Sequence, residues 1–446
     1  MANTRQVLND RFIVFNGAGK KQSAQGTGLA NGDLDTRIKC AITREEVIAR
    51  RDVRDCMDQD QISSEIVSRF ARYTLAITEL TPQIVALFTA WFLGGSTAPT
   101  GTPANEVQTL ARTGTVSGGT FTIALTLEGR TVTTKAIAWN ASTAAIQSAL
   151  TAARMLFVQP GSVTVGGDWT AGITLTFTGN LAKADIPAVV IDATNLTGST
   201  PGISVTETTK GAQNHHVLAR STTRVKPFIS FALGWDDVTN CVEKYIDHVV
   251  ESVNPSISLD GNASLNVVLL GPWEYDSIET SFTIPACSNI DPLQAQDCRI
   301  SIDSVWQTTD VNTLAVSVND NVPTDRLSAF PFDGIDIQNI ERGRQPAYGP
   351  ISASIFGSET DSLYDLAQNE RTEAAVAVVI HFGFPGDRVT WNFPATKVRF
   401  QTNRLGEAGE ARYSTIQIEG VPFSSGGASP FNATADVAQA TQFLLT

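Results

Sequence analysis

The chain has 446 residues, of which 42% are hydrophobic, and a formal net charge of −13. This length allows two to four domains with substantial cores. The acidic charge argues against a protein that binds nucleic acid tightly, because phosphate binding depends on clustered Lys and Arg. The longest uncharged apolar run, Ile84–Leu93, is too short to span a bilayer, and the first residues lack the apolar core of a secretion signal.

The cysteines argue against a disulfide scaffold and against a zinc site. Their number is odd and no CxxC spacing is present, which favours a reducing compartment. The five are Cys40, Cys56, Cys241, Cys287 and Cys298.

The N-terminal part begins with a polar, Gly-rich arm over residues 1–30. Within it the stretch NGAGKK, Asn16–Lys21, matches only part of a phosphate loop and precedes no helix pattern, so nucleotide binding is not expected. Eleven charged residues of both signs follow in Thr43–Glu65. This stretch is interpreted either as a solvated loop or hairpin, or as a protruding loop that docks on a neighbouring subunit through complementary charges.

A strand and a helix are predicted between Tyr73 and Gly95. Thr81 is suited to cap the helix, Pro82 fits its first position and Gly94 ends it. The apolar stripe that includes Trp91 and Phe92 is most simply a helix packed on a sheet. The alternative is that these rings contact a neighbouring subunit.

Residues 111–210 are predicted to form an inserted ββαββ unit. Alternating apolar residues from Phe121 to Leu127 indicate a half-buried strand, Glu128-Gly129-Arg130 a turn, and Asn140 or Ser142 the cap of a short helix. A second hairpin follows around GGDWTAG. Residues 112–210 hold six basic and five acidic residues, a net charge of about +1, which leaves about −14 on the rest of the chain. The unit is bracketed by Gly-, Pro-, Ser- and Thr-rich linkers, so we expect it to project outward.

The sequence outside this unit indicates an internal duplication. The strand and helix of 73–95 have a counterpart in 351–373, where Thr360 and Asp361 open a helix, and the strands that follow each helix agree in order and spacing. We therefore predict a mainly β fold. Its first unit covers 1–110 and 211–283, its second covers 284–446, and the inserted unit lies in a surface loop of the first.

Other motifs do not point to catalysis or to a bound cofactor or metal. SVNDNVPTD resembles part of a cadherin calcium site, in which Asp320, Asn321 and Asp325 would supply oxygen ligands, but an ordinary turn is the simpler interpretation. No two histidines have metal-binding spacing, and no nucleophile elbow is present. The histidines are His215, His216, His248 and His381. We expect neither an enzyme nor a cofactor.

The strand order after each helix, above all VESVNPSISLDGNASLNVVLLGPW, resembles the tail tube (major tail) proteins of long-tailed bacteriophages. The resemblance implies duplicated β-sandwich or barrel-like units that form rings in which strands of neighbouring subunits join. It also implies a virion protein, assembled in the host cytoplasm, whose rings of three chains and six units stack into a tube. Its partners would be itself, other tail proteins and genomic DNA that passes without specific binding, and no membrane.

On this resemblance, two sets of residues become candidates for subunit contacts. Candidates for contacts between stacked rings are Arg44, Glu45, Glu46, Arg50, Arg51, Asp52, Arg54 and Asp55. Other subunit-contact candidates are Trp91, Phe92, and Phe443, Leu444 and Leu445 in the C-terminal arm, 421–446.

The inserted unit resembles a small β-rich domain found repeatedly in phage structural proteins, through GTFTIALTLEGRT, AIAWNASTAAIQSAL and GITLTFTGNLAKADIP. This resemblance implies a surface decoration. The alternative function is a tail-tip or virion-surface protein that recognises a receptor or carbohydrate through this unit, with Trp139 and Trp169 as stacking rings. Packing within the unit is the simpler role for both tryptophans.

Overall fold

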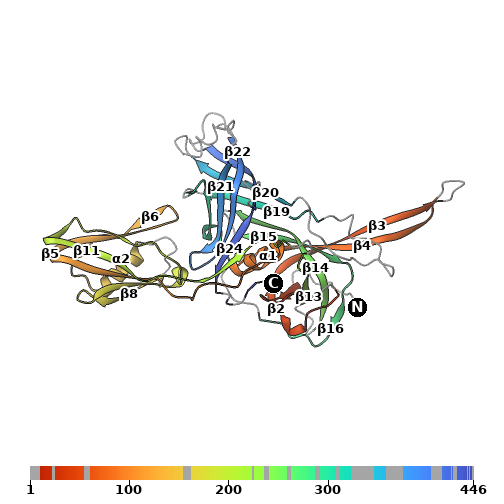
Figure 1. Cartoon of the computed structure of the whole chain (residues 1–446), viewed down its shortest axis with the longest axis horizontal. Coiled ribbons are helices and arrows are strands. Elements are labelled where there is room, and N and C mark those ends of the chain that lie inside the picture. Colours follow the sequence, from red (N-terminus) through yellow and green to blue (C-terminus); the bar gives the residue numbers. More distant parts are fainter. Residues whose placement is uncertain are drawn as a thin grey trace, which may run out of the picture.

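The structure is a computed structural model of the whole chain. It describes residues 11–22, 26–54, 61–153, 162–222, 226–235, 241–258, 263–286, 292–307, 311–322, 346–357, 375–402, 414–422, 424, 429–438, 440 and 442–443. The fold is mainly β, as the sequence predicts. Figure 1 shows a body, a separate module to one side of it, and a long two-stranded ribbon projecting on the other side.

The body is built from two sets of antiparallel strands. The first set comprises β1 (Arg11–Asn16), β2 (Leu34–Ile38), β3 (Cys40–Arg54), β4 (Gln61–Ile77), β13 (Ile229–Trp235), β14 (Val242–Ser258), β15 (Ser264–Pro272) and β16 (Ser277–Glu279). The second comprises β17 (Cys298–Ile302), β18 (Val305–Trp306), β19 (Val311–Asn319), β20 (Ala347–Gly357), β21 (Ala375–Phe384), β22 (Asp387–Thr402), β23 (Ser414–Pro422) and β24 (Asn432–Val437).

The two sets have the same strand order. In the first the order is β2–β1–β13–β14–β15–β4–β3, with β16 beside the start of β14. In the second it is β18–β17–β21–β22–β23–β20–β19, with β24 beside the start of β22. The chain also visits the corresponding strands in the same sequence, apart from the inserted module. That the two sets arose by duplication stays a prediction.

Helix α1 (Pro82–Leu93) forms as the sequence predicts. The Thr81 Oγ1 accepts a hydrogen bond from the Ile84 amide at 3.3 Å, and Gly94 ends the helix with a left-handed φ of 73°. The corresponding helix expected from Thr360 to Arg371 lies outside the described residues.

A single hydrophobic core joins both strand sets. It contains Phe15 and Tyr73 from the first set, Trp391 from the second, and most of α1. The Trp391 Nε1 donates a hydrogen bond to the Thr89 Oγ1 of α1 at 3.1 Å. Shared burial of this kind means that the two sets fold as one body rather than as two independent domains.

The module (107–209) has its own core. Its elements are β5 (Val107–Leu127), β6 (Arg130–Thr133), β7 (Ile137–Ala138), α2 (Thr143–Ala152), β8 (Val163–Asp168), β9 (Gly172–Phe177), β10 (Val190–Asp192) and β11 (Leu196–Thr209). The predicted hairpins and the helix cap at Ser142 are present. The long pairing of β5 with β11, from Val107↔Thr209 to Leu196↔Gly119, was not predicted.

Short elements complete the described structure. β12 (Asn214–Leu218) returns from the module and pairs with β24. Single turns of 3-10 helix lie at Asn31–Asp33, Gly179–Leu181 and Ala295–Asp297. Among the described residues, no helix is long and apolar enough to cross a membrane.

Candidate functional site

The ribbon β3–β4 projects from the body on the side opposite the module (Figure 1). Its two strands pair from Cys40↔Ile77 to Arg54↔Gln61. β15 covers β4 only from Phe70 to Ile77, so within the described residues the outer part of the ribbon has two strands alone (Figure 1). A two-stranded ribbon is marginally stable in water. This outer part is therefore a surface that a neighbouring molecule would stabilise.

The base of the ribbon is fixed by Arg44. Its guanidinium lies 3.5 Å from the centroid of the Trp273 ring and donates a hydrogen bond to the Trp273 carbonyl. The same guanidinium lies over the Tyr73 ring at 5.4 Å. Cation–π contacts of this kind hold the side chain within its own chain. Arg44 is nevertheless exposed, and its expected contact with a neighbouring ring stays a prediction.

The other ribbon candidates are placed only in part. Glu45 is exposed and Glu46 is half-buried. Four further candidates belong to β3, and the structure describes only their backbone: Arg50, Arg51, Asp52 and Arg54. Asp55 lies outside the described residues.

An aromatic cluster lies beneath the ribbon base. The rings of Tyr73 and Tyr245 are 5.5 Å apart, and the His248 ring is 5.4 Å from Tyr73. Burial raises the pKa of Tyr73 to about 12 and lowers the pKa of His248 to about 3, because both charged forms would be desolvated. Burial raises the pKa of Tyr245 as well, so all three groups are uncharged at neutral pH and pack as aromatic rings.

Other contact candidates are buried in this chain's own interior. Trp91 and Phe92 are 0% and 2% exposed, as the helix-on-sheet interpretation predicts. Phe443 is 2% exposed and its ring packs 4.8 Å from that of His216. None of these rings is at the surface to contact a neighbour, and Leu444 and Leu445 lie outside the described residues.

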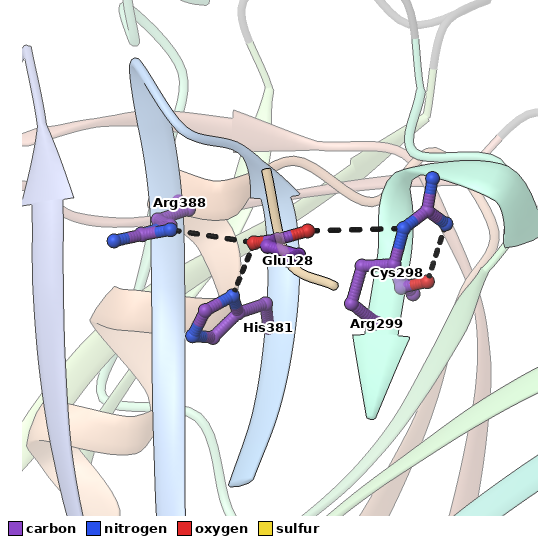
Figure 2. Close-up of polar contacts among 5 residues, drawn as sticks. All are labelled: Glu128, Cys298, Arg299, His381 and Arg388. Atoms are coloured by element: carbon purple, nitrogen blue, oxygen red, sulfur yellow. Dashed lines mark hydrogen bonds and ion pairs between the residues drawn. The ribbon is translucent and has the colours of Figure 1, made fainter. Parts of the chain in front are cut away.

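The module touches the body through the turn between β5 and β6, at Glu128 (Figure 2). One carboxylate oxygen of Glu128 lies 2.7 Å from the His381 Nδ1 and 3.4 Å from an Arg388 nitrogen, and the other lies 3.8 Å from the Arg299 Nε. The side chain of Glu128 is only 10% exposed. Three basic groups from three strands of the second set thus meet one carboxylate of the module.

The backbone of the turn that carries Glu128 lies in the left-handed region. Glu128 has a φ of 48° and Gly129 a φ of 78°, a two-residue hairpin turn that favours Asn or Asp followed by Gly. A glutamate is strained in the left-handed region, and such strain persists where the surroundings determine it. Here the longer side chain brings the carboxylate to the body. No sequence pattern indicated this role.

A second contact lies at the turn between β21 and β22. The Gly386 amide donates to the Asn180 carbonyl at 3.3 Å, and a Cβ on Gly386 would lie 2.3 Å from the Ala182 carbonyl oxygen. Burial raises the pKa of the neighbouring Asp387 to about 6. The module is therefore seated on the body at two places rather than held by its linkers alone.

The motifs set aside on sequence have structural roles. Asp320 lies 2.8 Å from the buried Lys226 Nζ, an internal ion pair, and Asn321 donates its amide to Asn319 in a turn. Asp325 lies outside the described residues. Within the described residues no cluster of three or more His, Cys, Asp or Glu could hold a metal ion.

The tryptophans of the module pack against an arginine. The Arg112 guanidinium lies 4.8 Å from the Trp139 ring centroid and 4.4 Å from that of Trp169. The Trp169 Nε1 donates to the Ala141 carbonyl at 2.9 Å. The rings are thus engaged in packing and in a cation–π arrangement within the module.

A scan against protein-family models and a search of curated proteins found no match to this chain.

Proposed function

We propose that the chain is a structural subunit of a bacteriophage tail tube. Copies of the chain assemble into rings, and the rings stack into a conduit for DNA. The observation that carries this proposal is the repeated strand order of the body, in which two like sets are joined edge to edge. A closed ring needs one heterologous contact repeated between like units. The pairing of β14 with β19 is one such contact between like strand sets within a single chain.

The ribbon and the charge support stacking around DNA. The outer part of β3–β4 is a two-stranded element that contact with an adjacent ring would stabilise. The net charge of −13 suits a conduit, because a basic wall would bind phosphates at each step of transit. The module, seated to one side of the body, decorates the assembly (Figure 1).

Negative-stain electron microscopy of the purified chain tests this function. We expect rings of uniform diameter, and tubes at high protein concentration. Mass photometry of the same sample should give a multiple of the 47.7 kDa chain mass, three copies being expected from the family resemblance. A strictly monomeric protein at high concentration, without rings or tubes, would contradict the proposal.

A further inference from the structure

The joint between the two strand sets lies in the second half of β14. There Ser252 pairs with Asn319 of β19, and the pairing continues to Ser258↔Thr313. The side-chain oxygen of Asn254 also accepts a hydrogen bond from the Val318 amide at 3.1 Å. The two sets are thus connected by an antiparallel ladder of one register, interrupted at Asn254 and Pro255, as well as by their shared core.

Each strand at this joint has a counterpart in the other set. β22 corresponds to β14, since each pairs first with the preceding strand and then with the following one. β3 corresponds to β19, since each pairs with the strand that precedes the helix position. Gly271 and Gly420 fix the register: Gly271 pairs with Ala71 of β4, and Gly420 pairs with Ile351 of β20.

This register assigns equivalent positions along the four strands. Ala71 pairs with Glu46, and its equivalent Ile351 pairs with Val316, so Glu46 is equivalent to Val316. Three positions further along each strand, Ala49 is therefore equivalent to Asn319. Val268 pairs with Ser252, and its equivalent Gln417 pairs with Gln401. The pair equivalent to Ser252↔Asn319 is therefore Gln401 with Ala49.

Among the described residues of a single chain, these equivalent edges have no strand paired beside them. Within the described ranges, β3 pairs with β4 alone, and the end of β22 past Lys397 pairs with β23 alone. Open edges present unpaired N–H and C=O groups that favour pairing with another strand. The strands joined through β14 and β19 follow the order β3–β4–β15–β14–β19–β20–β23–β22. The open edge of β3 thus lies at one end of this order, and the open edge of β22 lies at the other.

We propose that the end of β22 in one copy pairs antiparallel with β3 of the next copy, with Gln401 opposite Ala49. This inference rests on the proposed function and names the edges that meet. The contact between neighbouring chains then has the same geometry as the contact between β14 and β19, which joins the two strand sets within one chain. Because the two edges differ, the contact is heterologous and passes from copy to copy until the ring closes.

Cysteine pairs test the register in a background free of other cysteines. The variant Gln401→Cys with Ala49→Cys should, on mild oxidation, give linked dimers and larger species. The internal reference pair, Ser252→Cys with Asn319→Cys, should link within one chain. A displaced pair, Gln401→Cys with Thr43→Cys, should link at least tenfold less between chains, because the two positions would lie about 20 Å apart.

The outcomes separate this inference from the proposed function. Rings in the micrographs, with the reference pair linked and no chain-to-chain linkage at Gln401 and Ala49, overturn the edge assignment alone. Equal linkage of the displaced pair overturns the register. Absence of rings from the unsubstituted chain overturns the proposed function.

Hydrogen exchange of the unsubstituted chain gives a second measurement that needs no substitution. Amides on the open edge of residues 41–49 should exchange at least tenfold more slowly in rings than in dissociated chains. Equal exchange rates in both states would contradict the pairing.

Discussion

At the scale of single residues, Glu128 is the group on which the seating of the module most depends. Replacing it with alanine leaves His381, Arg388 and Arg299 facing a site without a carboxylate. We expect the Glu128→Ala variant to lose about 2 kcal/mol of stability, because a hydrogen bond to a charged group such as this carboxylate typically contributes about that much. Urea unfolding measures this loss, and hydrogen exchange should become faster at the β21–β22 turn.

The matched control is the variant Glu207→Ala. Glu207 is an exposed glutamate on β11 of the same module. The variant removes an identical charge without removing the contact with the body, so its unfolding curve should match the parent within about 0.5 kcal/mol. Equal losses in both variants would show that the Glu128 contact does not stabilise the chain.

His248 predicts a pH dependence at the ribbon base. Burial lowers its pKa to about 3, whereas the unfolded histidine titrates near its ordinary value of 6.5. The unfolded state therefore binds more protons below pH 6.5, and the stability due to neutral His248, complete above that pH, is lost as the pH falls toward 3. Between pH 7 and pH 5 the loss is about 2 kcal/mol.

Comparison with His248→Asn isolates this contribution. Asn does not titrate and still donates a hydrogen bond to the Ile246 carbonyl that His248 contacts. Asp387, whose pKa burial raises to about 6, acts in the opposite direction in both proteins and so cancels. The stability difference between parent and variant, from urea unfolding, should shrink by about 2 kcal/mol between pH 7 and pH 5. A constant difference would contradict the assignment.

At the scale of elements, the ribbon carries the prediction about stacking. Arg51 and Glu65 are paired, so an Asn-Gly turn can join them and remove residues 52–64. This variant keeps β3 through Arg51, including Ala49. We expect rings to form as in the parent but tubes to shorten severalfold, as measured in micrographs at matched concentration. Tubes of parent length would show that the outer ribbon makes no contact between rings.

The sequence predicts elements well where their signals are local. Thr81, Pro82 and Gly94 define α1 because capping and helix termination depend on neighbouring residues. The turn at Glu128 and Gly129 is predicted for the same reason, yet the partners of Glu128 are not. His381 and Arg388 lie more than 250 positions away along the chain. Only the folded topology brings such distant groups together.

At the scale of the whole molecule, the shared core is what the sequence could not predict. The order and spacing of strands indicate two like units, and the pairing order agrees with that pattern. Whether each unit has its own core depends on how α1 packs. Its Thr89 binds Trp391 across the two sets, a contact between residues without any local signal. Removing either set should therefore unfold the other.

The separate core of the module leads to the last prediction. Val107 and Thr209 are paired at its base, so a Gly-Ser bridge between them can replace residues 108–208. Among the described residues, the body's core contains none from that segment, and the strand edges proposed to meet in the ring lie outside it. We therefore expect the shortened chain to fold and to form rings of parent inner diameter.

Deletion should nevertheless reduce stability, because it removes the carboxylate of Glu128 from three basic groups of the body. The loss should be about 2 kcal/mol in urea unfolding, similar to that of Glu128→Ala. A double variant, the deletion with His381→Leu, should recover part of the loss, because an apolar side chain leaves no buried polar group without its partner. Insoluble or monomeric product from the deletion would mean that the module is required for assembly.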